Sequence, residues 1–329
     1  MAAQEYSHRS TVTGPARRRL VRLAEELEES GLPMPNSGPA RTLLLEEVDK
    51  ALRPQVHERR VASSGTILDP ASDSDEWSEG TRLDINWLPT DGNSADASRR
   101  FADGLSSWLL RRSVGDDEWV LFDRPAGSER DLVVIARALQ ATIVQRHPSG
   151  IVRIVGDFGV LRWQGLSWHH EPPVGTWIDL VVDDGPVGDP RVLRALLEFA
   201  VHDLGSLAIG ALLIYRGKPG TGPPVEEVLP PPPQLQIRTP FHLAPLRHAL
   251  AQVDGAAVFD HDGVLRRLGV RIVPSTAAEQ RVEPLGGTRH TSGRRYSYDD
   301  PTATVIAVSD DGPVSVFRNG AVLGRSASV

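Results

Sequence analysis

Two short motifs in the last third of the chain combine residue types suited to chemistry on phosphate groups. Asp254 is followed by Gly255 and Ala256, and Gly287-Thr288-Arg289-His290 comes about thirty residues later. A carboxylate can hold a metal ion or accept a proton from a hydroxyl, while an Arg, a His and backbone amides can carry phosphate charge. The two motifs therefore predict a site for phosphate transfer on a nucleotide.

Each motif also has a simpler interpretation. Gly255 and Ala256 would let a ligand approach the backbone closely, but Asp-Gly alone is more typical of an ordinary turn. The segment from Gly286 to Gly293 is rich in glycine and hydroxyl residues, so its amides could form an anion-binding nest beside the planar fork of Arg289. Alone, this segment is also consistent with a polar loop in which a Thr or Ser caps a helix.

The composition limits the classes of protein. The chain has 329 residues, enough for two domains, and its net charge of −7 excludes a nucleic-acid binder of the basic type. It contains no cysteine, which excludes disulfides, thiolate zinc sites and cysteine nucleophiles. No apolar run approaches the ~20 residues that cross a bilayer, and the N-terminus has no signal-peptide pattern. We expect a cytoplasmic protein with no membrane or nucleic-acid partner.

The N-terminal half is expected to be α+β. Hydrophobic spacing predicts helices over residues 13–30 and 40–52, and the Ser- and Asp-rich residues 63–80 are typical of a loop or linker. Further helices are predicted over residues 96–112 and about 129–146. Strands are predicted over residues 119–122, 151–155, 160–163 and 177–182. We expect a helical segment over residues 1–62 and an α+β domain of unknown role over residues 63–185.

A C-terminal domain is expected over residues 186–329. A helix over residues 192–201 and a buried strand over 209–215 precede the proline-rich residues 217–233, which predict a surface loop. A helix follows over residues 240–252. Asp-Gly pairs then predict two hairpins, with strands over residues 256–259 and 264–273 and over 304–308 and 314–317, before an Asn319-Gly320 turn.

The order and spacing of these motifs resemble the diadenylate cyclase (DAC) domain, first associated with the DNA-integrity-scanning checkpoint protein. That family carries Asp-Gly-Ala, then Gly-Thr-Arg-His-Arg, then an apolar strand ending in Val-Ser-Glu-Glu, then Gly-x-Ile-Ser-Val. The corresponding residues are 254–256, 287–290, 305–311 and 312–316. The resemblance covers about residues 190–325, the C-terminal half only, and implies an α/β domain with a central mixed sheet flanked by helices.

The resemblance implies an activity and roles for particular residues. Enzymes of this family join two ATP molecules into cyclic di-AMP, with release of two pyrophosphates, across two protomers that meet face to face. It assigns catalysis to Asp254, Arg289 and His290, with Asp254 and His290 beside a Mg²⁺ or Mn²⁺ ion. The nucleotide-binding residues that it implies are Gly255, Ala256, Gly287, Thr288, Thr291 and Ser309. The implied partners are ATP and at least one further copy of the chain.

One departure from the family keeps other functions open. Thr291 stands where the family has Arg, so a phosphate contact is lost unless Arg294 or Arg295 reaches in from the next turn. A catalytically weakened module that binds or senses ATP or a cyclic dinucleotide is the alternative, and a scaffold in which the domain only dimerises is a third. His169-His170 predicts no metal site, because adjacent residues of a strand point to opposite faces.

Overall fold

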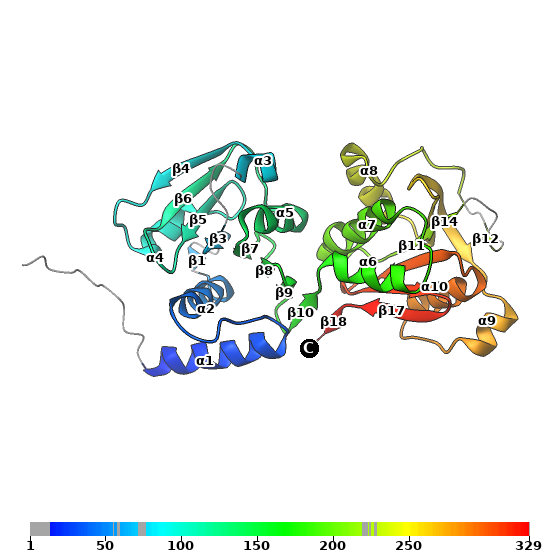
Figure 1. Ribbon diagram of the computed structural model, residues 1–329, viewed down its shortest axis with the longest axis horizontal. Helices are drawn as coiled ribbons and strands as arrows, with labels where there is room; N and C mark the ends of the chain where they lie inside the picture. Colours follow the sequence, from blue (N-terminus) through cyan, green and yellow to red (C-terminus); the bar gives the residue numbers. More distant parts are fainter. Residues whose placement is uncertain are drawn as a thin grey trace, which may run out of the picture.

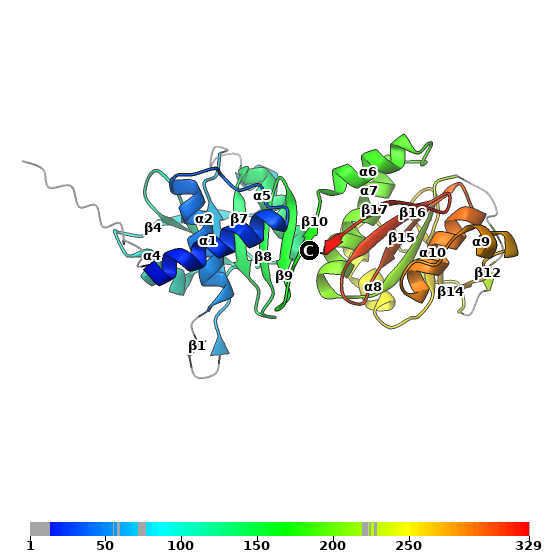
Figure 2. The ribbon, with the colours of Figure 1, turned by 90° about the horizontal axis from the view of Figure 1, so that it is seen from below.

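The computed structural model describes residues 14–54, 56–57, 60–71, 77–218, 223, 225–226 and 229–328. They form two α/β halves that lie side by side, each built on its own large sheet (Figures 1 and 2). A short antiparallel pair, β1 (Val56–His57) and β2 (Arg60–Val61), stands apart from both sheets.

The N-terminal half contains a nine-stranded sheet with the order β18-β10-β9-β8-β7-β3-β5-β6-β4. Only the pairing of β3 with β5 is parallel among the strand pairs described for this sheet. The last strand of the chain, β18, pairs with β10 and thus extends the sheet of the other half. The strands are β3 (Ser64–Leu68), β4 (Ile85–Pro89), β5 (Ser107–Arg111), β6 (Glu118–Phe122), β7 (Thr142–Arg146), β8 (Val152–Gly156), β9 (Gly159–Trp163), β10 (Trp168–Glu171) and β18 (Ala327–Ser328).

Helices cover both faces of this sheet. On one face, α1 (Gly14–Glu29) and α2 (Pro39–Leu52) bury their leucines against β7, β8 and β9. On the other face, α5 (Glu129–Leu139) packs with α3 (Trp77–Thr81), and a capping box of Ser128 and Asp131 fixes where α5 begins. A short α4 (Ala95–Ser98) and the 3₁₀ turn η2 (Arg99–Phe101) lead into β5.

The C-terminal half contains a seven-stranded mixed sheet with the order β12-β14-β13-β11-β15-β16-β17. The pairing of β11 with β13 is parallel, and the other described pairings of this sheet are antiparallel. The strands are β11 (Ala211–Arg216), β12 (Val225–Glu226), β13 (Ala256–Phe259), β14 (Leu265–Ile272), β15 (Ala303–Val308), β16 (Val314–Arg318) and β17 (Ala321–Arg325).

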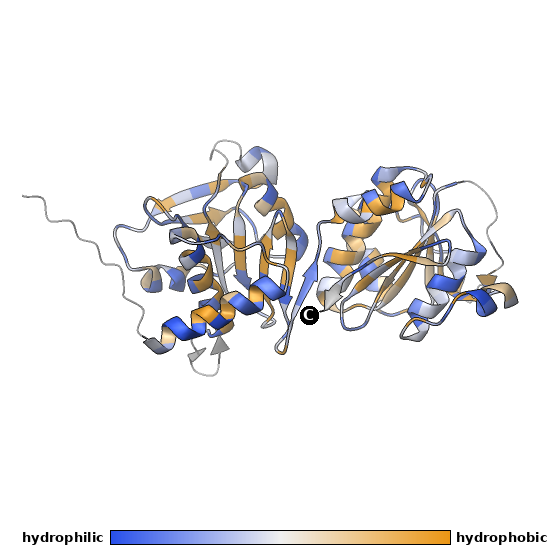
Figure 3. Ribbon diagram, turned by 60° about the horizontal axis from the view of Figure 1, so that its bottom comes forward, coloured by the Kyte–Doolittle hydropathy of each residue, from blue (hydrophilic) through white to orange (hydrophobic). Residues whose placement is uncertain are grey.

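This second sheet lies between two helical layers. Leu213 and Tyr215 of β11 face a core formed with one layer, while Leu212 and Ile214 face the other core, as the two-residue period of a strand requires. Figure 3 shows the apolar strands between the more polar helices. The first layer contains α6 (Val174–Asp183), α7 (Pro190–Glu198), the π-helical turn η3 (Phe199–Leu204), the 3₁₀ turn η4 (Gly205–Leu207) and α8 (Pro240–Leu250); the second contains α10 (Thr288–Asp299), with α9 (Thr276–Arg281) beside it.

The expected fold class is confirmed, with a mixed sheet flanked by helices in the C-terminal half and an α+β N-terminal half. The expected helices in the regions of α1, α2, α7 and α8 are present, as are the two hairpins β13–β14 and β15–β16. Thr13, the first residue of the helix expected over 13–30, and part of the proline-rich loop lie outside the described residues.

Four expected elements are wrong. Residues 63–80 are not a linker, because β3 runs through them as an interior strand whose last four residues are buried. The helix expected over residues 96–112 ends at η2, and the strand β5 follows, with Trp108, Leu109 and Leu110 all buried. The strand expected over residues 177–182 is the helix α6, since Val174, Trp177, Ile178 and Val181 form one buried helical face. Similarly, the helix expected over 129–146 stops at α5, where Gln140 is left-handed, and β7 follows.

Arg318 attaches α6 to the C-terminal half. Its guanidinium is buried and donates hydrogen bonds to three carbonyls. Val181 lies in the last turn of α6, and Gly185 and Pro186 follow the helix. Trp177 of α6 also packs against Gly324 of β17. This packing attaches α6 to the C-terminal half, and the domain bounds expected at residues 62 and 185 stay predictions.

The described helices include none that combines the length and the hydropathy needed to span a lipid bilayer.

Candidate functional site

Three neighbouring strands of the C-terminal sheet bring the two sequence motifs to one edge. The register places Ala211 of β11 opposite Val308 of β15 and Leu212 opposite Ala256 of β13. Because β11 and β13 are parallel and β15 is antiparallel to β11, the starts of β11 and β13 lie beside the end of β15. We call this place the polar edge; it comprises Gly210, Asp254, Ser309 and the first turn of α10.

Asp254 stands at the polar edge directly before β13. It is exposed, and its carboxylate has no ion pair or hydrogen bond within the part of the chain that the structure describes. Gly255 has φ of 102°, and a Cβ there would lie 2.7 Å from the carbonyl carbon of Gly269 and 2.9 Å from the oxygen of Val270. Only glycine fits this turn. Ala256, the first residue of β13, is buried, whereas the carboxylate of Asp254 faces solvent.

The first turn of α10 supplies hydrogen-bond donors at the same edge. Gly287 precedes the helix with φ of 82°, and it provides no side-chain cap. The first bond of the helix runs from the Thr291 amide to the Gly287 carbonyl, so the amides of Thr288, Arg289 and His290 have no acceptor within the helix. Unpaired amides and the helix dipole favour an anion at this position.

Arg289 is held at the polar edge by a carboxylate that the sequence did not identify as its partner. Its Nη1 donates to Oδ1 of Asp310 at 2.7 Å and to the carbonyl of Val308 at 3.4 Å. The Arg289 side chain is 30% exposed, so one side of its guanidinium is open to solvent. A Cβ on Gly210 would lie 2.5 Å from Arg289 Nη1 and 1.7 Å from Asp310 Oδ1, which explains the glycine before β11.

His290 points inward from the same turn. It is 8% exposed, and its ring meets that of Phe317 in β16 edge-to-face, with the centroids 6.1 Å apart. Burial, assisted by the charges of Arg325 and Arg289, lowers the pKa of the imidazole below its ordinary value. The ring is therefore neutral at pH 7, and a neutral imidazole can accept a hydrogen bond or bind a metal ion.

Thr291 has a structural task in this turn. Its hydroxyl donates to the Leu285 carbonyl at 2.7 Å and accepts from the Leu285 amide at 3.1 Å, which fixes the loop before α10. Arg294 does not replace the family arginine, because it donates to the carbonyls of Gly320 and Glu283, away from the polar edge. Arg295 is likewise directed to the Val282 carbonyl. Neither arginine is therefore directed to the first turn of α10.

Ser309 ends β15 at the polar edge and is half-buried. Its amide donates to the Pro313 carbonyl and its carbonyl accepts from the Gly312 amide, which closes the turn that carries Asp310. The register therefore places Ser309 two strands away from Asp254, at a strand spacing of ~4.8 Å.

A second group of possible metal ligands lies at the other end of β13. Asp260, His261 and Asp262 have ligand atoms within 4.8 Å of one another and could hold a metal ion. Asp260 already accepts from the amides of Asp262 and Val264 and pairs with Arg266 at 2.5 Å. This group is thus separated by the length of β13 from Asp254, the residue that the sequence motif favours.

The residues of the polar edge fit a metal that is held mainly through a nucleotide. Mg²⁺ is usually bound by one or two carboxylates together with substrate phosphates. The unpaired oxygen ligands of Asp254 match that pattern, and His290 adds a neutral nitrogen in the neighbouring turn.

A large cavity lies away from the polar edge, beside α5. Its volume is about 1040 Å³, and we call it the α5 groove. Arg130 and Arg137 of α5 line it together with the turn from Gly156 to Gly159, and Glu198 and His202 line it from the C-terminal half. The two halves therefore share this groove.

Comparisons with known proteins assign a family model to each half. Residues 198–322 match the model described as "DisA bacterial checkpoint controller nucleotide-binding", and residues 21–171 match "Probable sensor domain DACNK". A crystal structure described as the hypothetical membrane spanning protein from Bacillus cereus is 17% identical over 43% of this chain and 72% of that chain, with a TM-score of 0.28. The search of curated proteins gave no match.

Proposed function

We propose, from the premise that residues 198–322 are a domain of the DisA bacterial checkpoint controller nucleotide-binding family, that the chain is a diadenylate cyclase. It would join two ATP molecules into cyclic di-AMP with release of two pyrophosphates. The observation that carries this proposal is the polar edge, where an unpaired carboxylate, an arginine and free helix amides gather at the ends of adjacent strands.

The residues at the polar edge divide the work of nucleotidyl transfer. The amides of Thr288, Arg289 and His290, with the open side of the Arg289 guanidinium, would hold the triphosphate and stabilise the charge that develops on it. Gly287 and Gly255 would let the nucleotide approach the backbone, and Ala256, Thr291 and Ser309 remain proposed neighbours of the nucleotide.

Asp254 would assist the attacking 3′-hydroxyl. A hydroxyl is a weak nucleophile until a carboxylate or a metal ion lowers the cost of losing its proton. Asp254 would hold a Mg²⁺ or Mn²⁺ ion, with His290 close to it, and a bound ion would supply charge stabilisation at the phosphate. The exposed position of Asp254 leaves its carboxylate free for either role.

The decisive assay is incubation of the protein with ATP and Mn²⁺, followed by chromatography of the nucleotides. We expect cyclic di-AMP from the wild type. Asp254→Asn should lower the rate by ~10²–10⁴-fold while leaving ATP binding largely intact, because it removes the proton acceptor or metal ligand and keeps the shape.

Asp262→Asn is the matched control, since Asp262 belongs to the metal-ligand group at the far end of β13. We expect it to retain wild-type activity. A wild-type rate in Asp254→Asn would refute the role of Asp254, and loss of activity in Asp262→Asn alone would transfer the metal site to residues 260–262.

The reaction also predicts a dependence on assembly. Each protomer would bind one ATP, and each 3′-hydroxyl would attack the α-phosphate held by the other protomer, so a lone protomer has half of a site. The specific activity should fall when the protein is diluted below its dimer dissociation constant, while ATP binding per protomer stays the same. A constant specific activity through that range would contradict the two-chain site.

One observation favours a second function, an ATP-binding or cyclic-dinucleotide-binding module with weak catalysis. Thr291 replaces the family arginine, and its hydroxyl is already occupied by the backbone of Leu285. ATP that binds and stays unconverted in the assay above would support this alternative.

A further inference from the structure

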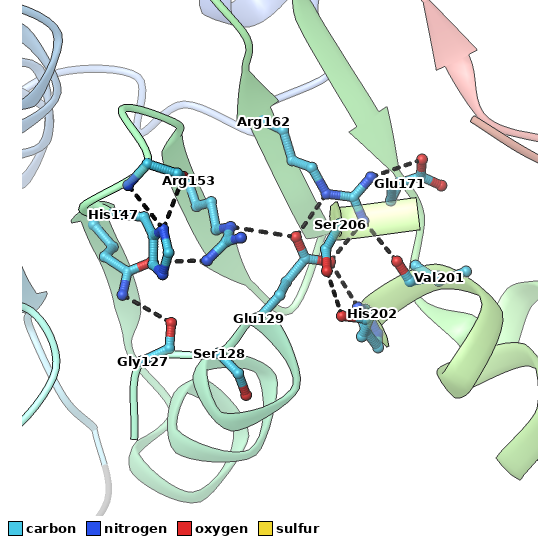
Figure 4. Close-up of polar contacts among 12 residues, drawn as sticks. Gly127, Ser128, Glu129, His147, Arg153, Arg162, Glu171, Val201, His202 and Ser206 are labelled. Carbon is cyan, nitrogen blue, oxygen red and sulfur yellow. Dashed lines mark hydrogen bonds and ion pairs between the residues drawn. The ribbon is translucent and has the colours of Figure 1, made fainter. Parts of the chain in front are cut away.

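A buried ionic cluster joins the two halves of the chain (Figure 4). Glu129, the first residue of α5, is 1% exposed and accepts from Nε and Nη2 of Arg162 in β9, both at 2.6 Å. The same carboxylate lies 2.9 Å from Nδ1 of His202, which belongs to η3 of the C-terminal half. We call Glu129, Arg162, His202, Glu171 and Ser326 the junction.

The junction contacts the C-terminal half at one further point, Ser326, through Glu171. Arg162 Nη1 donates to Glu171 at 3.1 Å, and the other oxygen of Glu171 accepts from the Ser326 hydroxyl at 2.7 Å. That hydroxyl in turn accepts from the amide of Val314, the first residue of β16. Glu171 of β10 thus connects the N-terminal sheet to the start of a strand in the nucleotide-binding domain.

Arg162 also supports the π-helical turn directly. Its Nη2 donates to the Val201 carbonyl at 3.0 Å, and Val201 lies in η3. A π turn is rare and is frequently found at functional sites. Here its conformation is tied to side chains of the other half, because both Val201 and His202 are bonded to them.

From η3 the chain leads to the polar edge within a few residues. Gly205 packs backbone to backbone against Gly312 in the turn after Asp310, as a Cβ on Gly205 would lie 2.7 Å from the Gly312 oxygen. Gly210, eight residues after His202, lies against the Arg289–Asp310 pair. A shift of η3 must therefore displace the turn that holds Arg289 or open a gap beside it.

The α5 groove borders the same elements. Arg130 pairs with Asp203 of η3 at 2.7 Å and lies 3.4 Å from Glu198 of α7, and Arg130, Glu198 and His202 line the groove. A molecule bound in the groove would contact the residues that hold η3 in place.

We propose that the junction transmits the state of the N-terminal domain, and of its α5 groove, through η3 to the Arg289–Asp310 pair, so that this domain sets the nucleotide affinity of the polar edge. The part of this inference that concerns nucleotide affinity rests on the proposed function. The substitution that tests it is Glu129→Gln, which keeps the shape of the side chain and removes the charge that Arg162 and His202 share.

The experiment uses the full chain and two measurements. Hydrogen exchange should be faster than in the wild type at amides remote from the substitution, in residues 205–212 and 309–316. ATP affinity, measured by calorimetry, should change by ~5–150-fold, the usual range for coupled sites. Ser326→Ala is the milder second variant, and it should show the same pattern with smaller changes in residues 205–212 and 309–312; Val314 is left out because its amide donates directly to Ser326.

Glu47→Gln is the matched control. Glu47 is another buried carboxylate of the N-terminal half, paired with Arg99 and Arg111 and not with any junction residue. We expect it to raise exchange in residues 205–212 and 309–316 no more than elsewhere in the C-terminal half, as a general loss of stability does. If Glu47→Gln changed exchange in these residues as much as Glu129→Gln does, the effect of Glu129→Gln would be general destabilisation. That result would overturn the proposal.

The proposal would also be overturned if both Glu129→Gln and Ser326→Ala exchanged as the wild type does at the remote amides. If Glu129→Gln does not fold, Ser326→Ala decides. Should the wild type bind no ATP, the proposed function fails, while the exchange measurement still decides whether the junction controls the polar edge.

Discussion

At the scale of single residues, the polar edge depends on a glycine that carries no functional group. Gly210 leaves room for the guanidinium of Arg289 and the carboxylate of Asp310, which meet directly above its Cα. The arginine is thereby fixed by a partner on one side and open to solvent on the other. Its orientation is set before any nucleotide arrives, and preorganised charge is what makes such groups effective in catalysis.

Gly210→Ala should impair activity without unfolding the protein. The new methyl group would overlap Asp310 and Arg289, and the mostly exposed Asp310 side chain can swing away at little cost. We expect ~10-fold or greater loss of cyclic di-AMP formation with an unchanged melting temperature, because a small misplacement of a positioning group is costly in rate. Gly175→Ala is the control, since a Cβ there meets no atom within 4 Å.

The sequence carries Asp254, Arg289 and His290 in recognisable motifs, and the structure places Asp254 and the first turn of α10 at one edge. No sequence motif predicts that Arg289 pairs with Asp310, or that residue 210 must be glycine. These residues are more than twenty positions apart, and only the register of β11 with β15 brings them together.

At the scale of elements, local patterns predicted the hairpins and the strands β6, β8 and β9, but they missed the interior strands β3 and β5. Asp-Gly turns between apolar runs identify β13–β14 and β15–β16 because a hairpin is a local structure. The strands β3 and β5 lie inside the sheet and are buried on both faces, so they lack the alternation that marks a strand. Their partners are far away in the sequence, and β5 pairs with β3 across about forty residues.

Glu47 stabilises this interior part of the sheet. It lies on α2, is 3% exposed, accepts from Thr66 of β3, and pairs with Arg99 of η2 and Arg111 of β5. Burial alone would raise the pKa of its carboxyl, but the two arginines outweigh it and hold the pKa below the ordinary value of 4.5. The charged carboxylate is therefore part of the folded state at neutral pH.

Glu47→Gln should lower the free energy of unfolding by about 3 kcal/mol or more, because it leaves two partly buried arginines without their shared charge. The wild-type advantage should be fully present above pH 4.5 and shrink as the pH falls, since the folded pKa lies below the unfolded one. Urea titrations at several pH values measure this difference. Glu46→Gln, whose side chain is 35% exposed, should cost less than about 1 kcal/mol.

At the scale of the whole molecule, the two halves are joined by buried charge and by a shared sheet. The ion pairs of Arg162 with Glu129 and Glu171 lie out of contact with water, and β18 adds to the sheet of the other half. Removing one partner of such a buried pair is costly because the other charge is left unpaired. None of this was visible in the sequence, where the junction residues are spread from position 129 to position 326.

This connection predicts cooperative unfolding. The wild type should melt in one calorimetric transition, because separating the halves exposes the junction. Glu171→Ala should divide the melt into two transitions by leaving Arg162 and Ser326 without their common acceptor. The half-buried pair of Arg112 with Glu118, which lies within the N-terminal sheet, provides a control in Glu118→Ala, which should keep one transition. Two transitions already in the wild type would contradict this view.

The attachment of α6 by Arg318 leaves only a narrow bridge between the halves. With α6 fixed to the C-terminal body, the covalent link is Pro172–Pro173, and proline has a fixed φ. The returning segment β18 runs hydrogen-bonded beside β10, so the bridge is a ribbon two strands wide. Because Glu129 also contacts His202 and Arg130 also pairs with Asp203 across the two bodies, neither body can swing on this ribbon without breaking those contacts.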